Sequence, residues 1–174
     1  MKHALVLLLL LCSGKLFAEW QEFSKAGVRA LFPSTPIVLE NSKEITIGAL
    51  YKDCGFKVHI PAELTILESK ETKEQFLESL LRRNREEFGQ YLSEVSEQTT
   101  SSPPWIQVRV SEDYSGWPFT YRYIYANGRL YVGELICHEG DYPSKDVESQ
   151  FFNGIRVGFD NKSLNPGVHS VAAG

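Results

Sequence analysis

The chain has 174 residues, of which 43% are hydrophobic and 23% are charged, and its formal net charge is −4. These proportions are ordinary for a globular protein and exclude a chain that is disordered throughout. The acidic balance argues against nucleic acid and anionic lipid as main partners. We therefore expect one folded domain with its own core and no nucleic-acid partner.

The first 18 residues have the pattern of a cleavable export signal. Lys2 supplies a positive start, the apolar run 4–12 is too short to span a bilayer as a helix, and Ala18 is a small residue at the cleavage position. We expect cleavage after Ala18 and a soluble, extracytoplasmic chain, periplasmic or secreted, that begins at Glu19 and has no transmembrane span.

Cys12 raises a second alternative, a lipid anchor on that cysteine. Leu11 precedes it, and a lipoprotein signal has a small residue at that position, so the lipid-anchored form is the less favoured one. A short buried N-terminal helix is a third reading, which nothing downstream supports with a matching apolar partner.

Two cysteines follow the leader, Cys54 and Cys137. An oxidising compartment would permit a disulfide between them, and two semi-buried thiols are the alternative. The chain has no CxxC motif, so the sequence supports neither a thioredoxin-like redox site nor a cysteine-rich zinc site.

The first half of the chain predicts strands and then a helix. Apolar residues alternate within 28–33, 44–52 and 56–60, and the last two ranges predict a hairpin. An apolar stripe at helical spacing then predicts a helix over 70–88, with Thr72 and Gln75 in a capping box.

The strongest local signal is a second hairpin, preceded by a predicted strand over 106–110. Alternating segments at 119–126 and 129–137 flank Asn127-Gly128, and this dipeptide favours a two-residue type I′ turn. The turn sets the register, which pairs Ala126 with Arg129 and Tyr121 with Glu134. Both faces of the hairpin are largely apolar, so we expect it in the middle of a sheet that is covered on both sides.

The C-terminal part predicts a short helix, a last strand and a tail. Ser144 can cap a helix that runs to about Phe152, and alternation at 155–159 suggests a strand. Residues 160–174 have little to bury, and we interpret them as a disordered tail after a folded domain over 19–159.

Three segments resemble the PsbP-like family over residues 20–157. They are Trp20-x-x-Phe23 with Gly27-Val28-x-Ala30-x-Phe32-Pro33-x-x-Pro36, Tyr123-x-Tyr125-x-Asn127-Gly128-Arg129-Leu130-Tyr131, and Phe151-Phe152-Asn153-Gly154-Ile155-Arg156-Val157. The resemblance implies an α+β fold, a central antiparallel sheet flanked by helices in an α/β/α sandwich. It also implies non-catalytic work as an extrinsic or assembly subunit. It supplies no metal ligand, because no ligand motif of the family matches here.

The richest cluster of metal-ligand residues is His138, Glu139 and Asp141, directly after a predicted strand. A loop could gather them around a divalent ion, but the spacing matches no standard motif, and a solvated turn is the simpler reading. His59 falls on the polar side of its strand, and no serine sits in a nucleophile-elbow pattern. We therefore expect no cofactor and no catalytic residues.

Aromatic residues supply the interaction candidates. Tyr114 and Trp117 lie in a Gly- and Pro-containing loop, where a large aromatic side chain often marks a contact surface. Tyr121 and Tyr123 could form a platform for a ligand, although packing under a helix explains them more simply.

The sequence thus favours an exported, non-catalytic binding or assembly module whose partner is an envelope protein or complex. Two alternatives stay open: a small-ligand carrier with a pocket between sheet and helix, and a metal-assisted secreted hydrolase that uses His138, Glu139 and Asp141.

The export hypothesis predicts the mass of the protein recovered from its native envelope fraction. We expect an intact mass that starts at Glu19, because Ala18 precedes the cleaved bond. Intact mass spectrometry measures this directly, and a diacylated species that starts at Cys12 would contradict the prediction.

Overall fold

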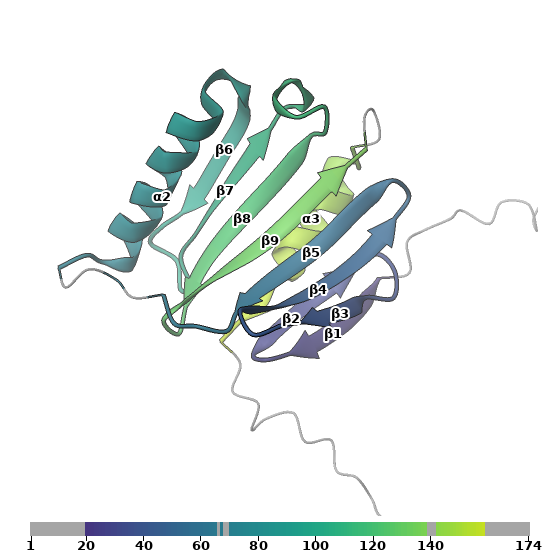
Figure 1. Ribbon diagram of the computed structural model, residues 1–174, viewed down its shortest axis with the longest axis horizontal. Coiled ribbons are helices and arrows are strands. Elements are labelled where there is room, and N and C mark those ends of the chain that lie inside the picture. The colour runs from purple at the N-terminus through teal and green to yellow at the C-terminus, as the bar shows by residue number, and fades with distance from the viewer. Residues whose placement is uncertain (1–19, 66, 68–69, 139–141, 159–174) are drawn as a thin grey trace, which may run out of the picture.

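The computed structural model describes residues 20–65, 67, 70–138 and 142–158. Within them, ten strands form two antiparallel sheets, and two α-helices lie against the larger sheet (Figure 1). The predicted leader and the predicted tail lie outside the described residues.

The small sheet has three strands and the large sheet has seven. In spatial order, the small sheet contains β1 (Gln21–Lys25), β2 (Val28–Phe32) and β10 (Arg156–Val157). Also in spatial order, from one edge to the other, the large sheet contains β3 (Ile37–Glu40), β4 (Glu44–Tyr51), β5 (Cys54–Pro61), β9 (Arg129–Cys137), β8 (Phe119–Ala126), β7 (Trp105–Val110) and β6 (Leu92–Gln98). The helices are α2 (Lys73–Phe88) and α3 (Lys145–Gly154), with short 3₁₀ turns at Gly89–Tyr91 and Glu112–Tyr114.

The β8–β9 hairpin has the predicted register. Ala126 pairs with Arg129 and Tyr121 with Glu134, and the turn residues Asn127 and Gly128 have φ values of 51° and 72°. Because β9 and β8 have β5 and β7 as their outer neighbours, the hairpin lies in the middle of the large sheet, as its two apolar faces predicted. The capping box of Thr72 and Gln75 and the Ser144 cap are also present.

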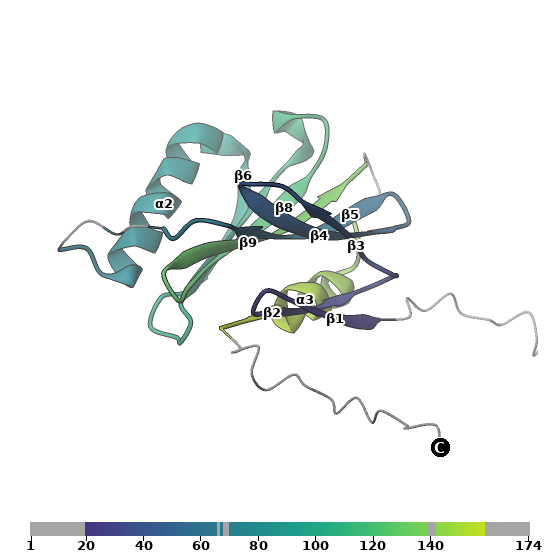
Figure 2. The same cartoon turned by 60° about the horizontal axis from the view of Figure 1, so that its bottom comes forward.

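The two faces of the large sheet are covered by different elements (Figure 2). On one face, Leu77 and Leu81 of α2 pack against Ile106 and Val108 of β7 and against Tyr125. On the other face, α3 and the small sheet enclose the main core, whose largest fully buried side chains include Phe32, Phe56, Phe151 and Phe152.

The expected α/β/α sandwich is wrong, because the protein is β-rich. Strands contribute more of the described structure than helices, and the layer around α3 is itself partly a sheet. The reason is that β2 pairs with β1 along its length and with 156–157 through residues 28–29, instead of extending the large sheet. That pairing forms a second sheet where the family resemblance implied a helical layer.

The disulfide joins two neighbouring strands of the large sheet. Cys54 begins β5 and Cys137 ends β9, the two residues are partners in the register, and their sulfur atoms are bonded across a sequence separation of 83. The bond therefore fastens the N-terminal hairpin to the central hairpin at one end of the sheet.

Among the described residues, neither helix has the length and apolar character that crossing a membrane requires.

Phe151 is the residue through which α3 is anchored to both sheets. Its ring is fully buried and lies 5.2 Å from the Phe56 ring and 5.9 Å from the Phe32 ring.

We predict that Phe151→Ala lowers the free energy of unfolding by about 3–5 kcal/mol, because the substitution leaves a large cavity in the core. Chemical denaturation measures this. Val95→Ala on the edge strand β6 is the control and should cost about 0.5 kcal/mol or less. Equal losses in the two variants would contradict the assignment of Phe151 to the core.

Candidate binding site on the open face of the sheet

The strands β3 and β4 carry exposed aliphatic side chains on the sheet face that α2 shares, and β5 lies beside them. α2 packs over β7 and β8. The half of the face that β3, β4 and β5 form has no described element over it. Ile37 is 65% exposed, Leu39 63% and Leu50 78%. Contiguous exposed apolar residues of this size on a folded protein often mark an interaction surface.

The alternation of the strands explains why these side chains are exposed. β4 directs Ile47 and Ala49 into the core, so Gly48 and Leu50 face the opposite way. Ile37 of the edge strand β3 pairs with Gly48, and therefore shares that outer face.

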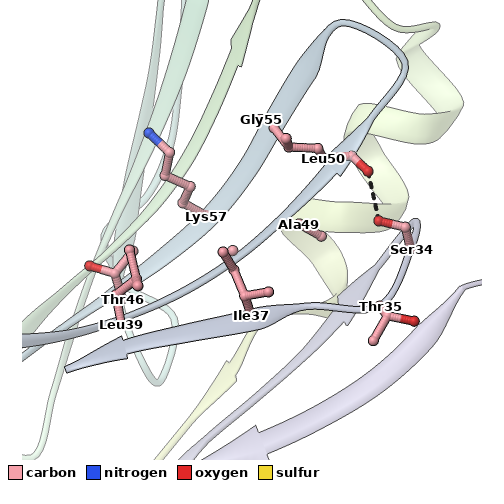
Figure 3. A pocket seen from close by; sticks show the side chains of 10 residues that line it. Ser34, Thr35, Ile37, Leu39, Thr46, Ala49, Leu50, Gly55 and Lys57 are labelled. Atoms are coloured by element: carbon pink, nitrogen blue, oxygen red, sulfur yellow. Dashed lines mark hydrogen bonds between the residues drawn. The ribbon is translucent and has the colours of Figure 1, made fainter.

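Two glycines hollow out the same face. Gly48 and Gly55 line a groove of about 420 Å³ with the aliphatic residues, and the Ser34 hydroxyl donates a 2.7 Å hydrogen bond to the Leu50 carbonyl at one end (Figure 3). The other lining residues are Thr35, Ile37, Leu39, Thr46, Ala49 and Lys57. A Cβ on Gly48 would meet the Lys57 Cγ at 3.4 Å and the Phe56 carbonyl oxygen at 3.5 Å, so the fold has room for a side chain there.

A polar cluster borders the groove toward the centre of the sheet. Lys57 Nζ donates to Glu134 Oε1 at 2.7 Å, and His59 Nε2 lies 3.0 Å from Glu134 Oε2. Burial raises the pKa of Glu134, but the hydrogen bonds from His59 and Lys57 outweigh it and hold the pKa below its ordinary value of 4.5. The carboxylate is thus ionised at neutral pH and fixes both neighbouring side chains.

His59 also has partners on its other side. Its Nδ1 lies 3.3 Å from the Thr46 hydroxyl and 3.6 Å from Glu44 Oε2. The Thr46 hydroxyl, the His59 imidazole and the Glu134 carboxylate follow one another in the order found in enzymes whose nucleophilic hydroxyl is activated by a histidine. The Thr46 hydroxyl, however, also lies 3.3 Å from Glu44 Oε1. A carboxylate beside the hydroxyl competes for its proton, so the geometry favours a structural cluster that borders a binding surface.

Tyr121 and Tyr123 are partly buried side chains that pack against the cluster around Leu77 and Leu81 of α2. The Tyr123 hydroxyl donates to Asn84 Oδ1 of α2 at 3.2 Å, and the two rings lie 5.9 Å apart in a row that continues to Phe119. Burial raises the pKa of Tyr123 to about 12 and, with the nearby Glu134, raises that of Tyr121. Both side chains thus pack beside α2, and a ligand contact at either of them stays a prediction.

The loop residues Tyr114 and Trp117 are both partly exposed. The Tyr114 ring lies 5.0 Å from Phe88 at the end of α2, and the Trp117 ring lies 5.3 Å from the His138 ring. A partner contact at this loop stays a prediction.

Two of the three residues of the predicted metal site lie outside the part of the chain that the structure describes. Glu139 and Asp141 lie outside the described residues, and His138 is exposed just beyond β9, where its backbone N–H donates to the Asp53 carbonyl at 2.8 Å. Among the described residues, no three metal-ligating side chains come together.

Sequence reasoning missed the open face. Leu50 sits among polar residues on the outer side of its strand, and Gly48 and Gly55 interrupt two otherwise good strand segments. A glycine inside a strand often marks close approach of another chain or a ligand, and this was the available signal.

Comparison with known proteins adds no assignment. No family model matches the chain, and no curated protein is significantly similar to it.

The lowered pKa of Glu134 predicts a pH-dependent stability difference between the wild type and Glu134→Gln. A carboxyl whose pKa is lower in the folded state stabilises the fold above its unfolded pKa and loses that effect as the pH falls through the folded pKa. We expect Glu134→Gln to be less stable than the wild type at neutral pH, and the difference to shrink below about pH 4.5. Urea denaturation at several pH values measures it, and a difference that grows toward acid pH would refute the pairing.

Proposed function

We propose that the protein is an exported, non-catalytic binding module whose open face over β3, β4 and β5 receives an apolar, extended segment of an envelope protein. The observation that carries this proposal is the exposed aliphatic trio, Ile37, Leu39 and Leu50, around the groove. Keeping such side chains in water is unfavourable, and a partner that covers them gains about 1.5–3 kcal/mol for each one fully buried.

The geometry of the sheet edge favours an extended segment. β3 is the outermost strand of the large sheet and pairs on one side with β4. An extended peptide can hydrogen-bond to such an edge while alternate side chains enter neighbouring hollows, a common mode of peptide recognition. The groove beside β3 offers such a hollow.

Three further features support export and a binding role. The leader pattern and the bond between Cys54 and Cys137 fit an oxidising compartment outside the cytoplasm. The PsbP-like resemblance supports work as an extrinsic or assembly subunit. We keep membership of that family as part of the proposal.

The carrier alternative needs a different location from the one the sequence suggested. Leu77 and Leu81 fill the space between α2 and the sheet, where they pack on Ile106 and Val108. A small apolar ligand would instead occupy the open groove, so the same variants address both functions.

Site-specific photo-crosslinking in the native cell tests the proposal. We expect a crosslinking amino acid at Leu39 to capture one envelope protein, and Gly48→Val in the same chain to abolish that adduct, because valine fills the groove. Leu50→Ser should weaken binding of the captured partner by about tenfold or more, since one buried leucine is lost. Isothermal titration calorimetry measures the second effect.

Matched controls separate the groove from general effects. The crosslinker at Val95, on the opposite edge strand, should give no such adduct, and Leu64→Ser, another exposed leucine, should bind normally. Gly48→Val must also keep the wild-type melting temperature. An adduct that persists in Gly48→Val would refute the proposed site. A bound small molecule, seen by native mass spectrometry and lost in Gly48→Val, would instead support the carrier.

A further inference from the structure

The face opposite the open groove contains a buried arginine with aromatic neighbours. Arg122 of β8 is 8% exposed, and its guanidinium carbon lies 4.2 Å from the Trp105 ring centroid and 5.1 Å from that of Phe152. The two rings thus hold the guanidinium by stacking and cation–π contacts.

The hydrogen-bond partners of Arg122 are neutral. Its Nε donates to Gln107 Oε1 at 2.8 Å and its Nη1 donates to Asn153 Oδ1 at 3.1 Å. Among the described residues, no carboxylate forms an ion pair with it, whereas the neighbouring Arg109 pairs with the buried Glu148. A buried charge ordinarily has an opposite charge beside it, so Arg122 is the exception in this cluster.

The arginine lines a pocket that contains a second cation. The pocket has a volume of about 550 Å³, and Arg156 contributes to its wall while its Nη1 donates to the backbone carbonyls of Asn153 and Ile155. Among the described residues, the polar lining is Gln98, Ser101, Ser102, Arg122, Asn153 and Arg156, which includes two cations and no carboxylate.

Arg122 keeps its charge at neutral pH. Burial, together with the nearby Arg156, lowers the pKa of Arg122 to about 10, which still leaves it protonated. The chain as a whole is acidic, so a pocket whose described lining has two guanidinium groups and no carboxylate is a local reversal of charge.

We propose that this pocket binds a small organic carboxylate with an apolar body. The carboxylate lies between Arg122 and Arg156, because guanidinium groups match its planar geometry. The body packs against Trp105, Ile124 and Ile155, which form the apolar part of the wall. This site is on the opposite face from the open groove and goes beyond the proposed function.

The apolar wall of the pocket favours an organic carboxylate over inorganic phosphate as the ligand. Phosphate carries more charge and no apolar surface, so it leaves the aromatic and aliphatic side of the pocket uncovered. An aromatic carboxylate satisfies the cations and covers that side as well, and pockets for organic ligands commonly combine the two. Benzoate and inorganic phosphate are therefore the paired probes.

Nuclear magnetic resonance of the full protein tests the inference. The reporters are the Nε–H of Arg122 and the Nε1–H of Trp105, which donates to Gln98 at 3.2 Å inside the pocket wall. We expect benzoate to shift both signals in a saturable way and phosphate to bind more weakly. Arg156→Gln should weaken benzoate binding by about tenfold, because the variant lacks the charged guanidinium that donates two hydrogen bonds to the carboxylate.

Arg156 is exposed, so its replacement leaves the core in place and avoids the risk that removing Arg122 unfolds the protein. Arg85→Gln on α2 is the matched control and should bind benzoate as the wild type does. Shifts that never saturate, tighter binding of phosphate than of benzoate, or unchanged affinity in Arg156→Gln would each overturn the proposal.

Discussion

The register of the β8–β9 hairpin is the constraint on which the rest of the structure depends. Asn127 and Gly128 both adopt positive φ, which a two-residue turn of this kind requires, and the turn leaves one pairing for the two strands. A shift by one residue would exchange the faces of every side chain in the hairpin. The register therefore decides that Tyr121 and Tyr123 lie under α2, and that Arg122 lies on the opposite face.

The width of the large sheet explains why one part of it stays open. Neighbouring strands are about 4.8 Å apart and a helix is about 10 Å wide, so one helix covers two or three strands. α2 covers the part around β7 and β8 on its face, whereas α3 and the small sheet together cover the other face. The seven-stranded sheet consequently exposes β3, β4 and β5 on the α2 side, where Ile37, Leu39 and Leu50 are found.

The two polar clusters of the sheet differ in how their charge is compensated. Glu134 is held between Lys57 and His59, so its charge is balanced within the fold and the cluster is complete by itself. Arg122 has aromatic neighbours and neutral hydrogen-bond acceptors, and the second cation of its pocket adds to its charge. The first cluster accordingly stabilises the sheet beside the groove, and the second presents a positive charge to a ligand.

Local signals determined the elements and the central register. Periodicity, the capping box of Thr72 and Gln75, and the Asn127-Gly128 turn each act between residues that are close in sequence, so the sequence by itself predicted both helices and the pairing of β8 with β9. Tertiary structure alone decided that 156–157 pairs with 28–29 in a second sheet, which replaced the expected sandwich with a β-rich fold. It also decided that, within the described part of the chain, Leu50 stays uncovered and Arg122 has no carboxylate in an ion pair with it, because both depend on which distant segments pack on each face of the sheet.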